Sequence, residues 1–422
     1  MNKKVIIIIT ALMGTFLSQV AGAEEWELKT CLEIGLKQNP TIRGAMKGVE
    51  GAEARVKQNQ ADYYPDLFAE TDYTRYKGSF SSGTSSGAMD RDLYNYYIGL
   101  SQNIYDFGRR EYKIQASRND LGTYQWTLKD TRLTVIDTIR QTYYGVLLAQ
   151  RVVKVRQEDL NRTREHFKQA QGFYQVGLKA KIDVTQAEVA VITAQKALLQ
   201  AENNVQISRV ALAAAMGLDK PPVYSLRDDL DTNRVSWQLE DLKKEALENH
   251  PGLNRLRASI QYYQSYEKWA QKEFWPKLTG TARYGWSGSD LPANETWNVG
   301  LQLNFPFFSG FESQAKLAEI RAALEQAKAN LATQILQVTS DLQSQYLNLQ
   351  LAEKQIDVAR EALRSANENL DLAEGRYKAG VGNMLDVTDA RSSFFQAETD
   401  YNQALYNYIT ARYKVDKVIG RE

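Results

Sequence analysis

The sequence predicts a mixed α and β protein in which each of two internal repeats combines a β-hairpin with long helices. Three observations predict this class: landmark residues recur at fixed separations, short segments alternate apolar and polar residues, and long segments carry an apolar residue every seven positions. A period of two is that of a strand, and a period of seven is that of a coiled-coil helix. The chain is therefore expected to contain strands and long helices, and both occur in each repeat.

The first 23 residues read as a secretory signal peptide. Lys3 and Lys4 precede an apolar run from Val5 to Leu17, and Ala21–Ala23 supplies small residues for cleavage. That order is typical of an exported protein. The run is too short to span a bilayer comfortably, and no later apolar stretch approaches the ~20 residues of a membrane helix. We therefore expect residues 1–23 to be removed and any membrane crossing to be made by strands.

The charge balance argues against a nucleic-acid partner, and the cysteine content excludes an internal disulfide. The 52 basic and 51 acidic residues leave a net charge of +1, so a nucleic-acid partner is not indicated. Cys31 is the only cysteine, which excludes a disulfide within the chain. Because it falls in an amphipathic helical segment, we expect it to be a buried helix residue.

Landmark residues define the two repeats. They are Trp26, Pro40 and Pro65 with the counterparts Trp237, Pro251 and Pro276, and then Tyr143, Gly177, Asp183 and Gly217 with the counterparts Tyr346, Gly380, Asp386 and Gly420. The separation is 211 residues for the first group and 203 for the second. We expect repeat 1 over residues 24–217, a connecting segment over 218–236 and repeat 2 over 237–422. The polar run Lys77–Asp92, longer than its counterpart, is expected to form an exposed loop.

Each repeat carries one predicted β-hairpin, over about residues 66–104 and 277–306, with strands of about ten residues. In the second hairpin, Trp297, Val299, Leu301 and Leu303 alternate with polar residues. One face of the strand is thus apolar and the other polar. A soluble β-sandwich would show the same alternation, so the pattern alone does not place the hairpins in a membrane.

Long coiled-coil helices follow the hairpins. Apolar residues recur every seven positions over Ile335–Tyr377 in the second repeat and over Ile139–Tyr174 in the first. A second row, three or four residues away, is made of alanine over Ala352–Ala373. Two rows at this spacing form a helix-packing seam, and the small alanines let neighbouring helices approach closely.

Four strands in one chain are too few to close a membrane barrel. An open strand edge in lipid leaves backbone groups without hydrogen bonds, so a barrel must be shared between chains. Two chains give eight strands and an interior filled by side chains, whereas three give twelve and can leave a lumen. A channel thus requires at least a trimer. Aromatic residues near the strand ends would form its interfacial girdle, namely Tyr94, Tyr96, Trp286 and Trp297.

The turns between the long helices carry a family resemblance. Arg376–Ala390 reads RYKAGVGNMLDVTDA, and Phe173–Ala187 reads FYQVGLKAKIDVTQA. With the openings IGLKQNPTI and ALENHPGL and the segment NFPFFSG, they resemble the TolC family over the whole mature chain. The resemblance implies a homotrimer in which a twelve-stranded outer-membrane β-barrel is continued by a long periplasmic α-helical coiled-coil barrel.

The resemblance also implies a function. It indicates a passive exit duct in the outer membrane of a Gram-negative bacterium, in contact with outer-membrane lipid. Its expected partners are a periplasmic adaptor and an inner-membrane pump of the RND or ABC type. Small-molecule efflux is favoured as the cargo class, and type I polypeptide secretion is the alternative.

Four residues are candidates for a periplasmic aperture. Asp386 and Asp389 lie three residues apart and share a helix face. The resemblance implies that they point into the lumen at the closed end, where six carboxylates of a trimer would disfavour full ionisation and favour cations. Asp386 could instead only stabilise a helix N-terminus, and Asp183, its counterpart, fits that role equally well.

Tyr377 is the fourth candidate. In relatives, the matching tyrosine bonds to an acidic residue that corresponds to Asp183, and this bond helps to hold the closed state. Tyr377 is also the last residue of the heptad row, where it would simply pack. Relatives carry an arginine where this chain has Gly382, so one of their closing links is missing here.

An enzyme is not indicated. The two histidines, His166 and His250, lie far apart in the sequence, and neither zinc-ligand spacing nor a phosphate loop occurs, so we expect no metal and no cofactor. The G-x-S-x-G match at residues 83–87 lacks the strand–turn–helix context of a nucleophile elbow. A secreted structural coiled-coil surface protein would explain the heptads and the signal peptide, but not the duplicated amphipathic hairpins.

Overall fold

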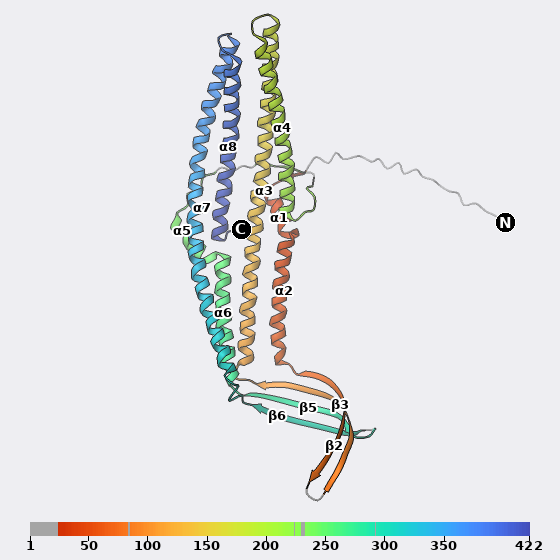
Figure 1. Cartoon of the computed structure of the whole chain (residues 1–422). Helices are drawn as coiled ribbons and strands as arrows, with labels where there is room; N and C mark the ends of the chain where they lie inside the picture. The colour runs from red at the N-terminus through yellow and green to blue at the C-terminus, as the bar shows by residue number, and fades with distance from the viewer. Residues whose placement is uncertain (1–23, 83–84, 223, 229–232, 292) are drawn as a thin grey trace, which may run out of the picture.

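The computed structural model describes residues 24–422 except 83–84, 223, 229–232 and 292. The predicted signal peptide therefore lies outside the described residues. The molecule is elongated, with a four-stranded sheet at one end and the tips of two helix pairs at the other (Figure 1). Helices fill the space between, so the fold class is mixed α and β, as predicted.

The two halves of the chain have the same order of helices and hairpin strands. The first half contains β1 (Glu24–Trp26), α1 (Leu28–Gln38), α2 (Pro40–Gln60), η1 (Ala61–Tyr63), β2 (Asp66–Ser82), β3 (Ser85–Tyr105), α3 (Arg109–Gln175) and α4 (Lys181–Met216). The second contains β4 (Tyr224–Leu226), α5 (Leu239–Asn249), α6 (Pro251–Gln271), η2 (Lys272–Phe274), β5 (Lys277–Gly288), β6 (Asn294–Asn304), α7 (Glu312–Lys378) and α8 (Met384–Ile419). Matching α-helices have the same lengths, which are 11, 21, 67 and 36 residues.

The longest helices, α3 and α7, follow the heptad rows. At ~1.5 Å per residue, each spans ~100 Å. The row positions Leu342, Leu349 and Leu370 of α7 are buried, as is Ile139 of α3. Each long helix packs along the shorter helix that follows it in sequence, so the apolar rows cover one another. Within the described ranges, no helix is long and apolar enough to cross a bilayer.

The four-stranded sheet has the order β2-β3-β5-β6, with every neighbouring pair antiparallel. Residues paired across strands share a face, and the register places Trp297 opposite Tyr284 and Tyr284 opposite Ile98. The same face carries Leu67, Ala69, Tyr73, Tyr94, Tyr96, Leu100, Ala282, Trp286, Val299, Leu301 and Leu303. These apolar residues, which come from all four strands, therefore form one continuous surface.

The opposite face of the sheet is polar. Near the end of β5, the buried side chain of Asn95 donates to Asp72 at 2.6 Å and accepts from the Ser287 hydroxyl at 2.6 Å. The Tyr97 hydroxyl donates to the same amide oxygen at 2.9 Å. These bonds tie three strands together through side chains, so the two faces differ in chemistry as well as in hydropathy.

The first hairpin corrects two expectations. Its strands are 17 and 21 residues long, not about ten, and the described residues of the run Lys77–Asp92 lie in paired strands instead of a loop. The pairing continues beyond Gly288, where β5 ends, so this hairpin projects past the second one (Figure 1). Cross-strand contacts explain why a polar segment pairs: Arg75 bonds Asp90 at 3.2 Å.

A small parallel sheet, which the sequence did not indicate, joins the start of the described chain to the connecting segment. It consists of β1 and β4, where the Trp26 ring stacks on Tyr224 with centroids 4.7 Å apart. Tyrosines of the long helices hold the same segment, because the Tyr143 hydroxyl donates to the Arg227 carbonyl at 3.0 Å. Cys31 is 0% exposed in the adjoining core, so its predicted burial is confirmed.

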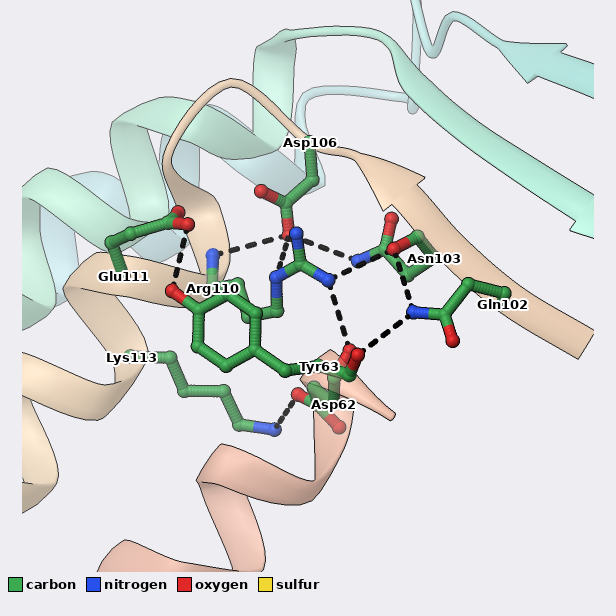
Figure 2. A network of polar contacts seen from close by, with 8 residues as sticks. All are labelled: Asp62, Tyr63, Gln102, Asn103, Asp106, Arg110, Glu111 and Lys113. Carbon is green, nitrogen blue, oxygen red and sulfur yellow. Dashed lines mark hydrogen bonds and ion pairs between the residues drawn. The ribbon is translucent and has the colours of Figure 1, made fainter. Parts of the chain in front are cut away.

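Arg110 fixes the base of the first hairpin to the helices (Figure 2). Its guanidinium is buried and donates to the carbonyl oxygens of Asp62 at 3.0 Å and Asn103 at 2.8 Å. The Asp106 carboxylate accepts from the Arg110 backbone N–H at 3.2 Å and so caps the start of α3. One side chain therefore connects η1, β3 and α3.

Candidate functional site

The two helix pairs, α3/α4 and α7/α8, end in turns of the same geometry. In the first turn, the Leu178 N–H donates to Phe173 O at 2.9 Å and Gly177 N–H donates to Tyr174 O at 3.0 Å. The second turn repeats these bonds around Gly380. This is a Schellman motif, which requires a residue with positive φ, and Gly177 (φ +76°) and Gly380 (φ +78°) supply it. Both turns lie at the end of the molecule opposite the sheet (Figure 1).

The predicted acidic residues follow these turns at the start of α4 and α8. Asp183 and Asp386 lie in the first helical turn, where a carboxylate is favoured by the helix dipole. Asn383 caps α8, its Oδ1 accepting from the Asp386 N–H at 2.8 Å. Asp386 and Asp389 are both exposed, and neither carboxylate has an ion pair in the part of the chain that the structure describes. The two predicted aperture carboxylates thus remain free to meet other groups.

Tyr377 is buried between the two turns. It is 1% exposed, and its ring lies 5.9 Å from that of Phe173, between centroids. Burial raises the pKa of Tyr377, and the nearby Asp183 carboxylate adds to that rise. Its hydroxyl has no hydrogen-bond partner among the described residues, so the bond to Asp183 that the resemblance implies is not formed. The packing role of Tyr377 is the one that the contacts support.

Lys179 makes a contact that sequence reasoning missed. Its Nζ donates to the Gly382 carbonyl at 2.9 Å and lies 5.1 Å from the centroid of the Tyr377 ring. The lysine belongs to the first turn, and its two partners belong to the second. No motif signalled it, because the contact depends on how two turns 203 residues apart approach each other.

Two buried polar links join the helix pairs further from the tips. Arg391 of α8 is 6% exposed, with its Nε 3.2 Å from an Asp159 oxygen, and it donates to the Thr163 hydroxyl at 2.6 Å. Burial lowers the pKa of Arg391, and Asp159 opposes that change. His166 of α3 lies 3.3 Å from Glu374 of α7. The signal for both links was a polar residue on a buried helical face.

A groove of about 470 Å³ separates α4 from α8 near the tips. Its lining includes the apolar side chains of Ile182, Val189 and Leu385, which are all more than half exposed. Arg391 forms part of the lining of the groove. Such an apolar strip beside two turns is suited to contact with another protein chain.

A family model described as outer membrane efflux protein matches residues 32–218 and 242–421. The two matches fall in the two halves of the chain.

Individual relatives are distant but cover most of the chain. Outer membrane protein TolC of Escherichia coli is 23% identical over 434 residues, covering 99% of this chain and 86% of that protein. The cobalt-zinc-cadmium resistance protein CzcC of Cupriavidus metallidurans is 26% identical, with 98% and 94% covered. The open-state MtrE outer membrane channel of Neisseria gonorrhoeae has a TM-score of 0.79 at 18% identity, with 93% and 89% covered. The likeness to MtrE establishes a shared fold.

Proposed function

This chain belongs to the outer membrane efflux protein family, and from that membership we propose that it is the outer-membrane exit duct of a tripartite efflux system. It conducts substrate passively from an inner-membrane pump and a periplasmic adaptor to the exterior. The observation that carries the proposal is the sheet, whose single apolar face and free strand edges lie at the far end from the helical tips. Such a sheet fits a lipid-facing barrel wall.

A homotrimer supplies the missing part of that wall. Strands β2 and β6 are the edges of the sheet, and unpaired edges are not tolerated in hydrocarbon. Three chains pair each β6 with a neighbouring β2 and close twelve strands around a polar lumen. The helices support the same ring: α6 packs against both α3 and α7, whereas α2 packs against α3 and keeps its other side open for the α7 of a neighbour.

The aperture of the duct is assigned to the tips. Asp386 and Asp389 of three chains form a ring of carboxylates, and the proposed aperture also includes Asp183 and Tyr377 of each chain, which lie close to each other. Their exposure and their lack of ion pairs support this assignment. A ring of acidic side chains favours cations over anions at a constriction.

Single-channel recording tests the aperture. We expect Asp386→Ala combined with Asp389→Ala to lower the cation preference of the purified trimer and to weaken block by multivalent cations. The matched control is Glu361→Ala with Glu368→Ala, which removes two carboxylates that pair with Arg364 in the C-terminal part of α7, before the turn. Equal selectivity in the wild type and the aperture variant would remove the assignment.

Membrane fractionation tests the duct itself. An oligomer that changes mobility on heating, found in the outer membrane, fits the proposal. A peripheral or soluble product would instead indicate a secreted coiled-coil surface protein. The finding that the Cupriavidus relative is named for resistance to three metal ions favours small solutes over polypeptides as cargo.

A further inference from the structure

The two helix pairs of one chain are joined by polar contacts at three levels near the tips. Arg391 binds Asp159 and Thr163 furthest from the turns, and His166 meets Glu374 closer to them. The third level is the bond from Lys179 to the Gly382 carbonyl. The first two are formed by side chains that leave the surface when the helices pack, whereas the third joins the turns themselves.

Gly382 cannot contribute a side chain to this third level. A Cβ at position 382 would lie 3.0 Å from the Tyr377 backbone nitrogen and 3.1 Å from the Arg376 carbonyl carbon. The Gly382 N–H is also bonded to the Arg376 carbonyl at 3.0 Å, which holds the turn in that position. In this chain the link at position 382 therefore comes from the opposite turn and ends on the backbone of Gly382.

Lys179 provides this link. Its side chain reaches from the first turn to the Gly382 carbonyl and passes over the Tyr377 ring, so the ammonium group gains a hydrogen bond and a cation–π contact. Both interactions are lost together if the two turns move apart.

We propose that Lys179 is the residue that holds the two turns of each chain together in the closed duct. This inference rests on the proposed function, because it assumes that the tips form the aperture. Opening that separates α3/α4 from α7/α8 at the tip must break the bond from Lys179 to Gly382. Lys179 thus sets how often the aperture opens, whereas the carboxylates set which ions pass.

The test compares Lys179→Met with Lys181→Met in the full-length trimer. Methionine keeps the length and the apolar stem of lysine but removes the charge and the donor. Lys181 is an exposed residue of the same tip, so the control removes the same charge without removing the contact. We expect Lys179→Met to raise the open probability in planar bilayers at least about five-fold, because the change removes one half-buried charged hydrogen bond from each of the three chains. Lys179→Arg retains the donors and should stay near the wild type.

A second readout does not depend on conduction. Amide hydrogen exchange in residues 176–180 and 379–383 should become about five-fold faster in Lys179→Met and remain unchanged in Lys181→Met. Wild-type open probability and wild-type exchange in Lys179→Met would overturn the inference, even if the wild-type trimer conducts. A wild-type protein that forms no channel would instead overturn the proposed function, and the exchange data would still decide whether Lys179 joins the turns.

Discussion

Two helix caps in corresponding positions show how a single residue changes the response to pH. Asn39 caps α2 through its side-chain oxygen, which accepts from the Thr41 N–H at 2.8 Å. His250 caps α6 in the same way, with Nδ1 accepting from the Gly252 N–H at 3.0 Å. Burial lowers the pKa of His250 in the folded state. A protonated Nδ1 cannot accept a hydrogen bond, so the cap works only while the ring is neutral.

The pH dependence of stability follows from that difference. The unfolded histidine titrates near pH ~6.5 and the folded one below it, so the unfolded state binds more protons at acidic pH. The contribution of the neutral cap is complete above pH ~6.5 and is lost as the pH falls below that value. We expect His250→Asn to lose less thermal stability than the wild type between pH 7.5 and 5.5, measured by circular dichroism. The reverse change, Asn39→His, should increase the loss, and identical losses in all three proteins would contradict the prediction.

At the residue scale, the features that depend on heptad periodicity and on motif spacing could be predicted from the sequence. Asp386 and Asp389 lie exposed at the start of α8, and their role in an aperture stays a prediction. Tyr377 is buried at the end of its heptad row, as the packing alternative predicts. The partner of Gly382 could not be foreseen, because Lys179 reaches it only once the two turns are placed in space.

At the scale of elements, the base of the first hairpin depends on one buried side chain. Arg110 satisfies two carbonyl oxygens and lies 4.3 Å from the centroid of the Tyr63 ring. The neighbouring pair of Lys113 and Asp62 is much more exposed, at 41% and 44%. The buried contact should therefore carry far more of the stability than the exposed ion pair, although both join α3 to η1.

Substitution separates the two contacts. We expect Arg110→Met to lower the free energy of unfolding by about 2 kcal/mol, because it leaves buried carbonyls without donors. Lys113→Met should cost only about 0.5 kcal/mol, as exposed ion pairs do. Urea denaturation of the detergent-solubilised protein measures both values. Losses of similar size in the two variants would show that Arg110 is not the main support of the hairpin.

The elements also differ in how far their lengths could be predicted. The heptad rows predicted the long helices α3 and α7, because a long helix that packs against a neighbour buries the same stripe of apolar side chains turn after turn. The first hairpin was longer than predicted because Lys77–Asp92 resembles a loop in composition, while backbone pairing and bonds such as that between Tyr73 and Asp92 at 2.8 Å keep it extended. The amino-acid composition of a segment does not reveal which strand it will pair with.

At the scale of the whole molecule, contacts inside the chain predict contacts between chains. If the two halves are equivalent units, the packing of α6 on α3 within one chain should recur as the packing of α2 on the α7 of a neighbour. Inside the chain, a Cβ at Gly122 of α3 would lie 3.6 Å from the Ala258 Cβ of α6. In the other repeat, the position equivalent to Gly122 is Glu325, at a separation of 203 residues, and the position equivalent to Ala258 is Lys47, at a separation of 211. Where two small residues, Gly122 and Ala258, meet within the chain, two oppositely charged residues, Glu325 and Lys47, are expected to meet between chains.

Charge reversal tests this arrangement of the proposed trimer. Among the described residues of one chain, Lys47 and Glu325 form exposed ion pairs only with Glu50 and Lys328 on their own helices, so we expect neither to be needed for folding of the protomer. We expect Lys47→Glu and Glu325→Lys each to lower the melting temperature of the trimer, because each places like charges face to face at three interfaces. Combining the two reversals restores the attraction between chains and should recover most of the lost stability, less the small cost of the like-charge pairs that the reversals create with Glu50 and Lys328 on their own helices. If the double variant shows merely the sum of the two losses, α2 and α7 do not meet between chains, and the ring is closed in another way.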